Sequence, residues 1–446
     1  MFFAHKFNKF HKYLSLCDGF LDVLEELGRC AVLDFAVWRF SLGVLSFTEL
    51  TEYTEFFYFR TCCLTSSNAL DGTYGVYIEL TLMYLKHLTG LNYRNLRECD
   101  LLFSPKFNCF LGSNGMGKTN VLDAIYYLSF TKSHLNAVDS QLIHHDEEFF
   151  MLQGEYEIAG QEELISAAVK RRAKKQFKRN KKDYQRMADH IGLIPAVLIS
   201  PSDQYLIDEG SDERRRFMDV VISQYDKPYL IALMRYNQAL QSRNALLKQD
   251  DMPDASMLEI YEMQMAVEAE YIYARRKAFI EGFMPVFKRF YCAIAGNGES
   301  VELHYKSHSE QGDLAPLLAE CRVRDHAIGY TTRGSHKDDL EMLLDGYPIK
   351  RTGSQGQNKT YLVALKLAQY VYLKQVTQEM PLLLLDDIFD RLDASRVKNI
   401  VDLVASDEFG QVFITDTNRN HTDQLMAQVE SEVKIFNVID GNVVLL

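Results

Sequence analysis

Several short segments after residue 82 alternate hydrophobic and polar residues, and this period of two predicts half-buried β-strands. The first two segments, Tyr84 to Asn95 and Glu98 to Phe103, are joined by a turn at Asn95. A further alternating segment runs from Phe149 to Ala159. Other segments are continuously apolar, which is typical of strands buried on both faces. These segments cover residues 107–111, 196–200, 382–385 and 411–415.

From Ser211 the period becomes helical, with leucines seven residues apart before the polar turn Asp250–Asp254. Beyond the turn a second heptad series begins. It consists of Leu258, Met265, Ile272, Phe279 and Val286. Ser256 and Glu259 have the spacing of a capping box for this second helix. The pattern predicts an antiparallel helical hairpin. Packed helices of an ordinary helical subdomain would share most of this geometry.

These elements predict an α/β fold, with a mixed sheet flanked by helices and an inserted α-helical hairpin lobe. We expect the first part of the core at 83–205, the helical lobe at 206–318, and the second part of the core at 319–446. Residues 1–82 differ, because they are crowded with aromatic residues and hold four of the eight cysteines. Our hypothesis is that Met83 is the natural start of the protein. An accessory helical domain is the alternative.

Composition narrows the possible classes of protein. The formal net charge of −12 argues against a chain that coats itself in nucleic acid, although a local basic face is compatible with it. The cysteines include no C-x-x-C pair, so neither a zinc site nor a disulfide framework is suggested, and a reducing cytoplasm fits. No uncharged apolar run reaches the roughly 18 residues that a membrane span needs.

The most basic segment of the chain runs from Lys170 to Lys182. Clusters of this kind contact nucleic-acid phosphates without reading the base sequence. A solvated hairpin is the usual alternative, and we expect a hairpin as the fold and DNA-backbone contact as its use. The lysines expected to contact DNA are Lys174, Lys175, Lys178 and Lys181.

The strand at 107–111 leads into G-x-x-x-x-G-K-T, and a helical pattern follows. Strand, glycine-rich turn and helix N-terminus are the context of a P-loop, whose backbone N–H groups converge on phosphate. We therefore expect ATP and Mg²⁺ here, with Lys118 on the β- and γ-phosphates and the Thr119 hydroxyl on the metal. The expected contact residues are Gly112, Ser113, Asn114, Gly115, Met116, Gly117, Lys118, Thr119 and Asn120.

Two carboxylates follow the four leucines of the strand at 382–385. The carboxyl end of a buried strand lies at the ligand-binding edge of a sheet. Asp386 would hold Mg²⁺, and Asp387 would orient or polarise the attacking water. A glycine- and serine-rich turn around Ser354 enters a strong helix, which alone is a weak signal. Asp203 or Gln204 is a further candidate for contact with metal or water.

Taken together, the P-loop, the turn G-S-Q-G-Q at 353–357, the segment L-L-L-L-D-D and the helical insertion between them resemble the ABC-type ATPase heads of the SMC/Rad50 class. Three further segments and the short insertion resemble the RecF family of bacterial DNA replication and repair proteins. The three segments are Ser200–Asp203, Glu213–Asp219 and Gln241–Lys248. The resemblance spans Met83 to Leu446.

The resemblance implies a weak, DNA-stimulated ATPase that forms a homodimer when ATP binds. Ser354, with Gly356 and Gln357 in the same turn, would contact the γ-phosphate held by the P-loop of the other protomer. Asp393 would lie in the loop that crosses the dimer interface, and Arg94 matches a phosphate-contacting arginine of the family. At Arg94 a solvated arginine at the end of a strand is an equally good interpretation of the pattern.

The family also implies partners and a location. The implied partners are duplex DNA near single-strand gaps, the proteins RecO and RecR, and indirectly the RecA recombinase that they load. The implied location is the cytoplasm, in association with the nucleoid and without a membrane. Two departures from common ABC enzymes suggest slow hydrolysis. Asp387 replaces the usual glutamate. The strand at 412–415 is followed by Asp416 and Thr417 instead of the histidine common in transporters, and His421 lies too far along to replace it. An ABC transporter subunit and an SMC-like structural DNA clamp are the rival interpretations.

Overall fold

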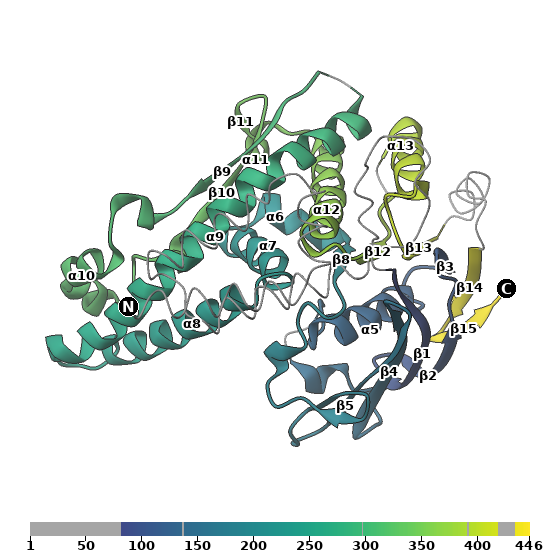
Figure 1. The fold of residues 1–446 in the computed structure, drawn as a ribbon, viewed down its shortest axis with the longest axis horizontal. Coiled ribbons are helices and arrows are strands. Elements are labelled where there is room, and N and C mark those ends of the chain that lie inside the picture. Colours follow the sequence, from purple (N-terminus) through teal and green to yellow (C-terminus); the bar gives the residue numbers. More distant parts are fainter. Residues whose placement is uncertain (1–81, 136–137, 297, 390–391, 418–432) are drawn as a thin grey trace, which may run out of the picture. The chain divides into compact units, whose positions relative to one another are not determined.

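The computed structural model describes residues 82–135, 138–296, 298–389, 392–417 and 433–446. The chain divides into two compact units, residues 1–79 and 80–446, and the described residues belong to the second unit. The predictions made for residues 1–81 concern residues outside these ranges. Figure 1 shows the arrangement of the described elements.

A mixed sheet in the order β15-β14-β3-β13-β12-β8 carries the candidate site. Strands β8, β12, β13, β3 and β14 are parallel neighbours, and β15 is antiparallel at the edge. The central strands β3, β12 and β13 are buried throughout and mostly apolar, as the sequence predicts. The bounds of the strands are β3 Phe107–Leu111, β8 Ala196–Ile199, β12 Leu382–Asp386, β13 Val412–Asp416, β14 Val433–Ile439 and β15 Asn442–Leu445.

A second sheet, in the order β2-β1-β4-β5-β6-β7, is antiparallel. Along β1 and β2, buried positions mostly alternate with partly buried or exposed ones, in agreement with the predicted period of two. Helix α5 (Lys118–Phe130) is buried along nearly all of its length and packs against both sheets. The bounds are β1 Met83–Tyr93, β2 Leu96–Leu102, β4 Phe149–Ile158, β5 Gln161–Lys170, β6 Gln176–Arg179 and β7 Lys182–Asp183.

The predicted helical insertion is present. Helices α6 (Tyr205–Asp208) and α7 (Ser211–Ser223) lead into α8 (Lys227–Leu247) and α9 (Ala255–Ala295), which run side by side in Figure 1. The second heptad series forms the buried face of α9, as expected. The residue predicted to cap α9 is wrong. Asp254, not Ser256, caps α9, because the Asp254 side chain accepts a hydrogen bond from the Ser256 backbone N–H.

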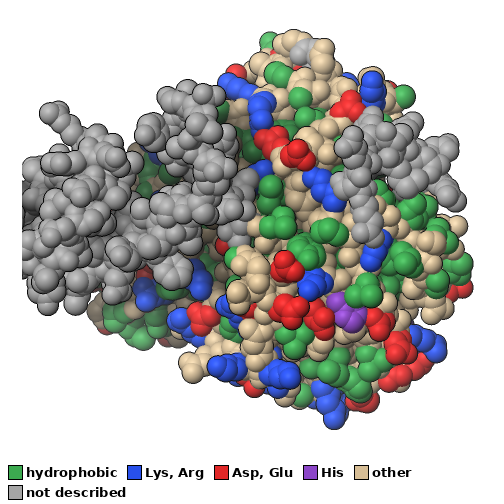
Figure 2. Space-filling view, turned by 45° about the vertical axis from the view of Figure 1, so that its right-hand side comes forward, with side chains coloured by type: hydrophobic (Ala, Val, Ile, Leu, Met, Phe, Trp, Pro, Cys, Tyr) green, Lys and Arg blue, Asp and Glu red, His purple; other side chains and the backbone are tan. Residues whose placement is uncertain are grey.

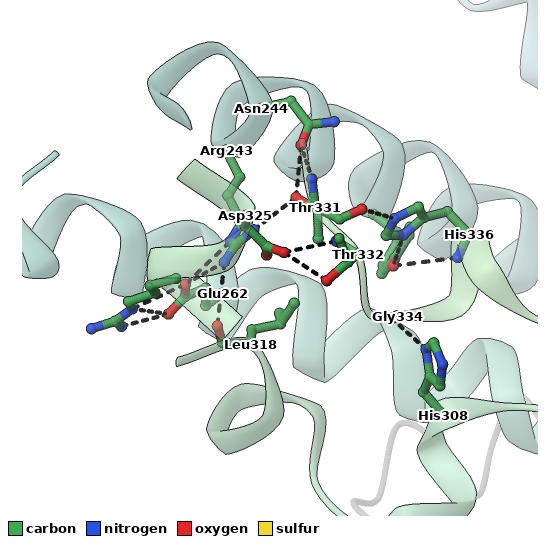
Figure 3. Close-up of polar contacts among 12 residues, drawn as sticks. Arg243, Asn244, Glu262, His308, Leu318, Asp325, Thr331, Thr332, Gly334 and His336 are labelled. Atoms are coloured by element: carbon green, nitrogen blue, oxygen red, sulfur yellow. Dashed lines mark hydrogen bonds and ion pairs between the residues drawn. The ribbon is translucent and has the colours of Figure 1, made fainter. Parts of the chain in front are cut away.

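Buried ion pairs hold the far end of this lobe together (Figure 3). Arg243 of α8 is fully buried, and its guanidinium lies 3.0 Å from Glu262 of α9 and 2.8 Å from Asp325. It also donates a hydrogen bond to the Thr331 hydroxyl. Each N–H of this buried arginine has a partner in a set direction. The cluster therefore specifies how the helices pack against one another.

The remaining elements return the chain to the core. The three-stranded sheet β11-β10-β9 contains residues from before and after the domain boundary expected between 318 and 319. This boundary therefore does not separate two groups of secondary-structure elements. The bounds are β9 Val301–Lys306, α10 Leu314–Ile328, β10 Asp339–Leu344, β11 Tyr347–Pro348, α11 Ile349–Thr352, α12 Gln355–Thr377 and α13 Ala394–Ala405. Within the described ranges, no helix is long and apolar enough to cross a membrane.

Candidate nucleotide-binding site

The P-loop sits between β3 and α5, as predicted. Gly117 precedes α5 with φ 110°, a left-handed conformation that favours glycine. A Cβ atom there would lie 2.6 Å from the Asn95 side chain, so only glycine fits. Ser113, Asn114 and Gly115 are exposed at the turn. The backbone of the loop is therefore accessible to a ligand at the N-terminus of a helix, which favours an anion.

Lys118 is buried at the base of this loop. Its Nζ donates hydrogen bonds to the Gly112 carbonyl at 2.8 Å and to the Ser113 carbonyl at 3.2 Å. The ammonium group has three donors and can move to a phosphate by exchanging these carbonyls. The position fits the role expected for the P-loop lysine.

Thr119 and Asp386 meet although 267 residues separate them. The Thr119 hydroxyl oxygen lies 2.9 and 3.0 Å from the two carboxylate oxygens of Asp386. Burial raises the pKa of Asp386, while hydrogen bonds from Thr415 and Thr119 lower it. A hydroxyl and a carboxylate placed side by side are the hard oxygen ligands that Mg²⁺ prefers together with water and phosphate. The residues present therefore fit the metal.

Thr415 is a residue of this site that the sequence did not single out. Its hydroxyl donates to Asp386 at 2.7 Å and accepts a hydrogen bond from the Asp387 backbone N–H at 3.0 Å. Asp387 has φ 45°, a conformation that is strained for aspartate. Thr415 thus holds both acidic residues. A polar residue at the carboxyl end of a buried strand, beside the strand of Asp386, was the available signal.

Arg94 lies beside the first turn of α5. Its Nη1 donates to the Asn120 side chain at 3.1 Å, and its Nε is 3.5 Å from an oxygen of Asp123. The neighbouring Asn95 donates to the carbonyl of Met116 at 3.1 Å. The turn between β1 and β2 is therefore tied to the P-loop, and it brings Arg94 close to the residues expected to bind phosphate.

A cavity of about 1020 Å³ opens beside the acidic residues, and its lining includes Asn114, Gln204 and Asp387. Asp203 also lines it, but its carboxylate pairs with Lys366 of α12 at 2.9 Å and accepts a hydrogen bond from the Ser200 N–H. The Asp203 carboxylate is therefore committed to contacts within the chain, which tie α12 to the segment after β8.

Ser354 is exposed at the N-terminus of α12. Its hydroxyl accepts a hydrogen bond from the Gln357 N–H at 3.2 Å, and the Gln357 side chain accepts one from the Ser354 N–H at 2.8 Å. A Cβ on Gly356 would lie 2.8 Å from the Arg396 guanidinium, so this turn borders α13. Asp393 caps α13 and is exposed, and the backbone hydrogen bond from Arg396 lowers its pKa. Across the described ranges, no hydrogen bond or ion pair joins Ser354 to the P-loop of its own chain.

The basic segment forms the edge of the hairpin β5–β6, with different surroundings for its lysines. Lys175 pairs with Asp139 at 2.8 Å and donates to the Thr131 carbonyl, and Lys178 lies 3.8 Å from Asp183. Lys174 and Lys181 are exposed and make no hydrogen bond or ion pair with any described residue. On the face drawn in Figure 2, basic and acidic side chains are interspersed rather than gathered. Contact of these lysines with DNA stays a prediction.

The chain is similar in sequence to known proteins. The sequence model described as the RecF/RecN/SMC N terminal domain matches residues 84–442. The DNA replication and repair protein RecF of Bacteroides fragilis is 57% identical over 360 residues, which are 80% of this chain and 97% of that protein. The chain belongs to the RecF family. The RecF of Porphyromonas gingivalis is 46% identical over 81% of this chain and all of that protein.

Solved structures give the same result for the fold. The recombination mediator protein RecF with ATP, of the RecFOR pathway, is 32% identical, with a TM-score of 0.73 over 82% of this chain and 98% of that one. An SMC head domain derived from Pyrococcus furiosus is 18% identical with a TM-score of 0.50, which supports the fold alone. The predicted ABC-type ATPase head of the SMC class and the predicted RecF family are both confirmed.

Proposed function

We propose that the chain is an ATP-dependent DNA-binding protein of recombinational repair and replication restart. ATP binding would join two copies head to head on DNA, and slow hydrolysis would release them. Membership of the RecF family supports this proposal, because the relatives are named DNA replication and repair proteins and a solved relative is named as a complex with ATP.

The proposal rests on how the residues expected to contact ATP are distributed, because some of them meet within one chain and others do not. Thr119 and Asp386 meet within one chain, while Ser354 lies exposed on another helix. A γ-phosphate on the P-loop would therefore take some of its expected contacts from its own chain and the others from Ser354 of a second copy. In this arrangement ATP acts as the link between two surfaces.

Hydrolysis needs few further groups, because phosphoryl transfer depends mainly on positioning and on charge stabilisation. Lys118 would neutralise charge on the β- and γ-phosphates, and Arg94 would add to that field. Asp387 would orient the attacking water, and Thr415 would fix its backbone. Mg²⁺, held through Thr119 and Asp386, would offset charge on the phosphate oxygens. The short arm of Asp387 is consistent with slow turnover.

DNA and protein partners form the second part of the proposal. The preferred DNA would be duplex at the edge of a single-strand gap, with Lys174 and Lys181 among the backbone contacts. RecO and RecR family proteins would act with the dimer to help load RecA, since a solved relative is assigned to the RecFOR pathway. An SMC-like structural DNA clamp is the alternative, because the SMC heads share this fold.

Gel filtration of the full chain with and without ATP and Mg²⁺ tests the proposal. We expect a shift from monomer to dimer that Lys118→Ala and Ser354→Arg each abolish. We expect Asp387→Asn to accumulate the dimer, because binding is kept while water activation is lost. An unchanged mass under all conditions contradicts the proposed ATP-driven clamp, and a monomeric Asp387→Asn chain with ATP contradicts the role given to Asp387.

A further inference from the structure

A second cavity lies away from the P-loop, where the end of α5 approaches the helical lobe. Its volume is about 440 Å³. A water molecule takes about 30 Å³ in the liquid, so the cavity is much larger than a single-water site. Its lining comes from the core and from the helical lobe. The lining includes Phe130 and Lys132 after α5, Arg215, Arg216 and Asp219 of α7, Asn237 of α8, Arg276 of α9, and Ser335.

The two acidic residues of this lining already have partners. Asp219 pairs with Arg276 at 2.9 Å and accepts a hydrogen bond from Tyr229. Asp212 pairs with Arg215 of the same helix. These two carboxylates are thus paired within the chain, and neither forms an ion pair with Lys132 or Arg216.

Two cations remain, Lys132 and Arg216. Lys132 makes no hydrogen bond or ion pair with any residue that the structure describes. Arg216 is 46% exposed, and its nearest carboxylate, Glu213, is 3.7 Å away. Partial burial lowers the pKa of Lys132, and repulsion from Arg216 lowers it further, while attraction to Asp219 opposes part of this shift. Two like charges that repel each other across a cavity would both be stabilised by an anion between them.

Neutral donors complete the lining. Ser335 is 1% exposed, and its hydroxyl has no hydrogen-bond partner among the described residues, which is costly for a buried polar group. Asn237 lines the same cavity with an exposed side chain. An arginine fork, an ammonium group and neutral donors suit an oxyanion that accepts several hydrogen bonds, and a phosphate group does so in several directions.

We propose that this cavity binds a small phosphate-bearing anion through Lys132 and Arg216. The two residues lie on opposite sides of the junction, Lys132 after α5 and Arg216 on α7. Occupancy would therefore link the ATPase core to the helical lobe. The phosphate could come from a free anion or from the end of a DNA strand, and both present the same chemistry.

Pyrophosphate is the probe, titrated by calorimetry into the full-length Lys118→Ala chain, in which the P-loop lacks its lysine. We expect saturable binding at one site, weakened at least about tenfold by Lys132→Met with Arg216→Met. The matched control is Lys174→Met with Lys181→Met, which removes the same charge from the exposed hairpin and should leave the affinity unchanged. No binding to the Lys118→Ala parent, or equal loss in both double variants, overturns the proposal.

Two further measurements complete the test. With the P-loop intact, the Lys132→Met and Arg216→Met pair should bind ATP within twofold of the parent, which excludes misfolding as the cause of the loss. A weakened ATP affinity beside lost pyrophosphate binding would assign the effect to the fold and overturn the proposal. Competition by a short duplex with a 5′-phosphate, but not by its unphosphorylated form, identifies a DNA end as the source. Failure of both duplexes to compete identifies a free anion.

Discussion

The two halves of the proposed ATP site differ in how much of each half one chain completes. On the P-loop side, Thr119, Asp386 and Thr415 are joined by hydrogen bonds of 2.7 to 3.0 Å within a single chain. On the other side, Ser354 and Asp393 cap two helices at the surface, and both are exposed. One half is internally braced, and the other is open.

Because of this difference, we expect ATP binding and closure of the dimer to depend on different parts of the chain. The braced half is preorganised, so ATP can bind to one chain with little rearrangement. The open half would complete its interactions only when a second copy arrives. Substitutions in the first half should therefore reduce ATP affinity and hydrolysis, whereas substitutions in the second half should prevent assembly and leave ATP affinity nearly unchanged.

The largest effect is expected from Lys118→Ala in the braced half. It removes the charge that we propose contacts the phosphates, and ATP hydrolysis should fall by about 100- to 1000-fold because the reacting group would lose one strong electrostatic interaction. Phosphate release at saturating ATP and calorimetric ATP binding measure this effect. Lys174→Ala, on the exposed hairpin, should leave both quantities unchanged in the absence of DNA. Hydrolysis within twofold of the parent chain would remove Lys118 from the site.

Ser354→Arg affects only the open half. A bulky cation at this cap should leave ATP binding within about twofold, while dimer formation is lost and hydrolysis falls at least about tenfold, or about 1.4 kcal/mol. Loss of the cap should cost only about 1 kcal/mol of stability. Light scattering with ATP and Mg²⁺ gives the mass, and Glu320→Arg on the exposed face of α10 is the matched control. If Ser354→Arg weakens ATP binding as strongly as Lys118→Ala does, the two halves are not separate.

Thr415→Val tests the bracing itself. It replaces a buried hydroxyl with a methyl group and removes hydrogen bonds to Asp386 and Asp387, each worth about 1 kcal/mol. We expect kcat to fall about tenfold while the ATP-dependent dimer still forms. Thr415→Ser restores the hydroxyl and should recover most of the rate. Equal rates for the valine and serine variants would show that the hydroxyl positions neither acidic residue.

The smallest effect is expected outside both halves. Lys174→Ala with Lys181→Ala should reduce the salt dependence of DNA binding, with the slope of log affinity against log salt changing by about 0.9 for each DNA phosphate that the protein no longer neutralises. Fluorescence anisotropy of a gapped duplex over a salt series measures this slope. Lys175 is not used in this test, because its pairing with Asp139 makes it part of the fold. An unchanged slope removes the hairpin from the DNA interface.

The features that depend on a local sequence pattern could be predicted from the sequence. The apolar strands, the glycine turn before Lys118 and the heptads of α9 each follow from short-range rules, and the carboxyl ends of parallel strands bring Thr119 to Asp386. Features set by long-range packing were not available. The role of Thr415 depends on β13 lying beside β12. The cap at Asp254 was missed for a local reason, because Asp254 and Ser256 are both residue types that suit an N-cap. The internal pairing of Lys175 likewise needed the position of Asp139.

Mixing two inactive chains tests the composite site most directly. Lys118→Ala keeps Ser354, and Ser354→Arg keeps the P-loop, so a mixed dimer would contain one intact composite site and one doubly impaired site. We predict that each variant alone hydrolyses almost no ATP and that an equimolar mixture recovers a clear fraction of the parent rate, with dimers detected by light scattering. A mixture no more active than the two separate chains would contradict a site closed by two copies.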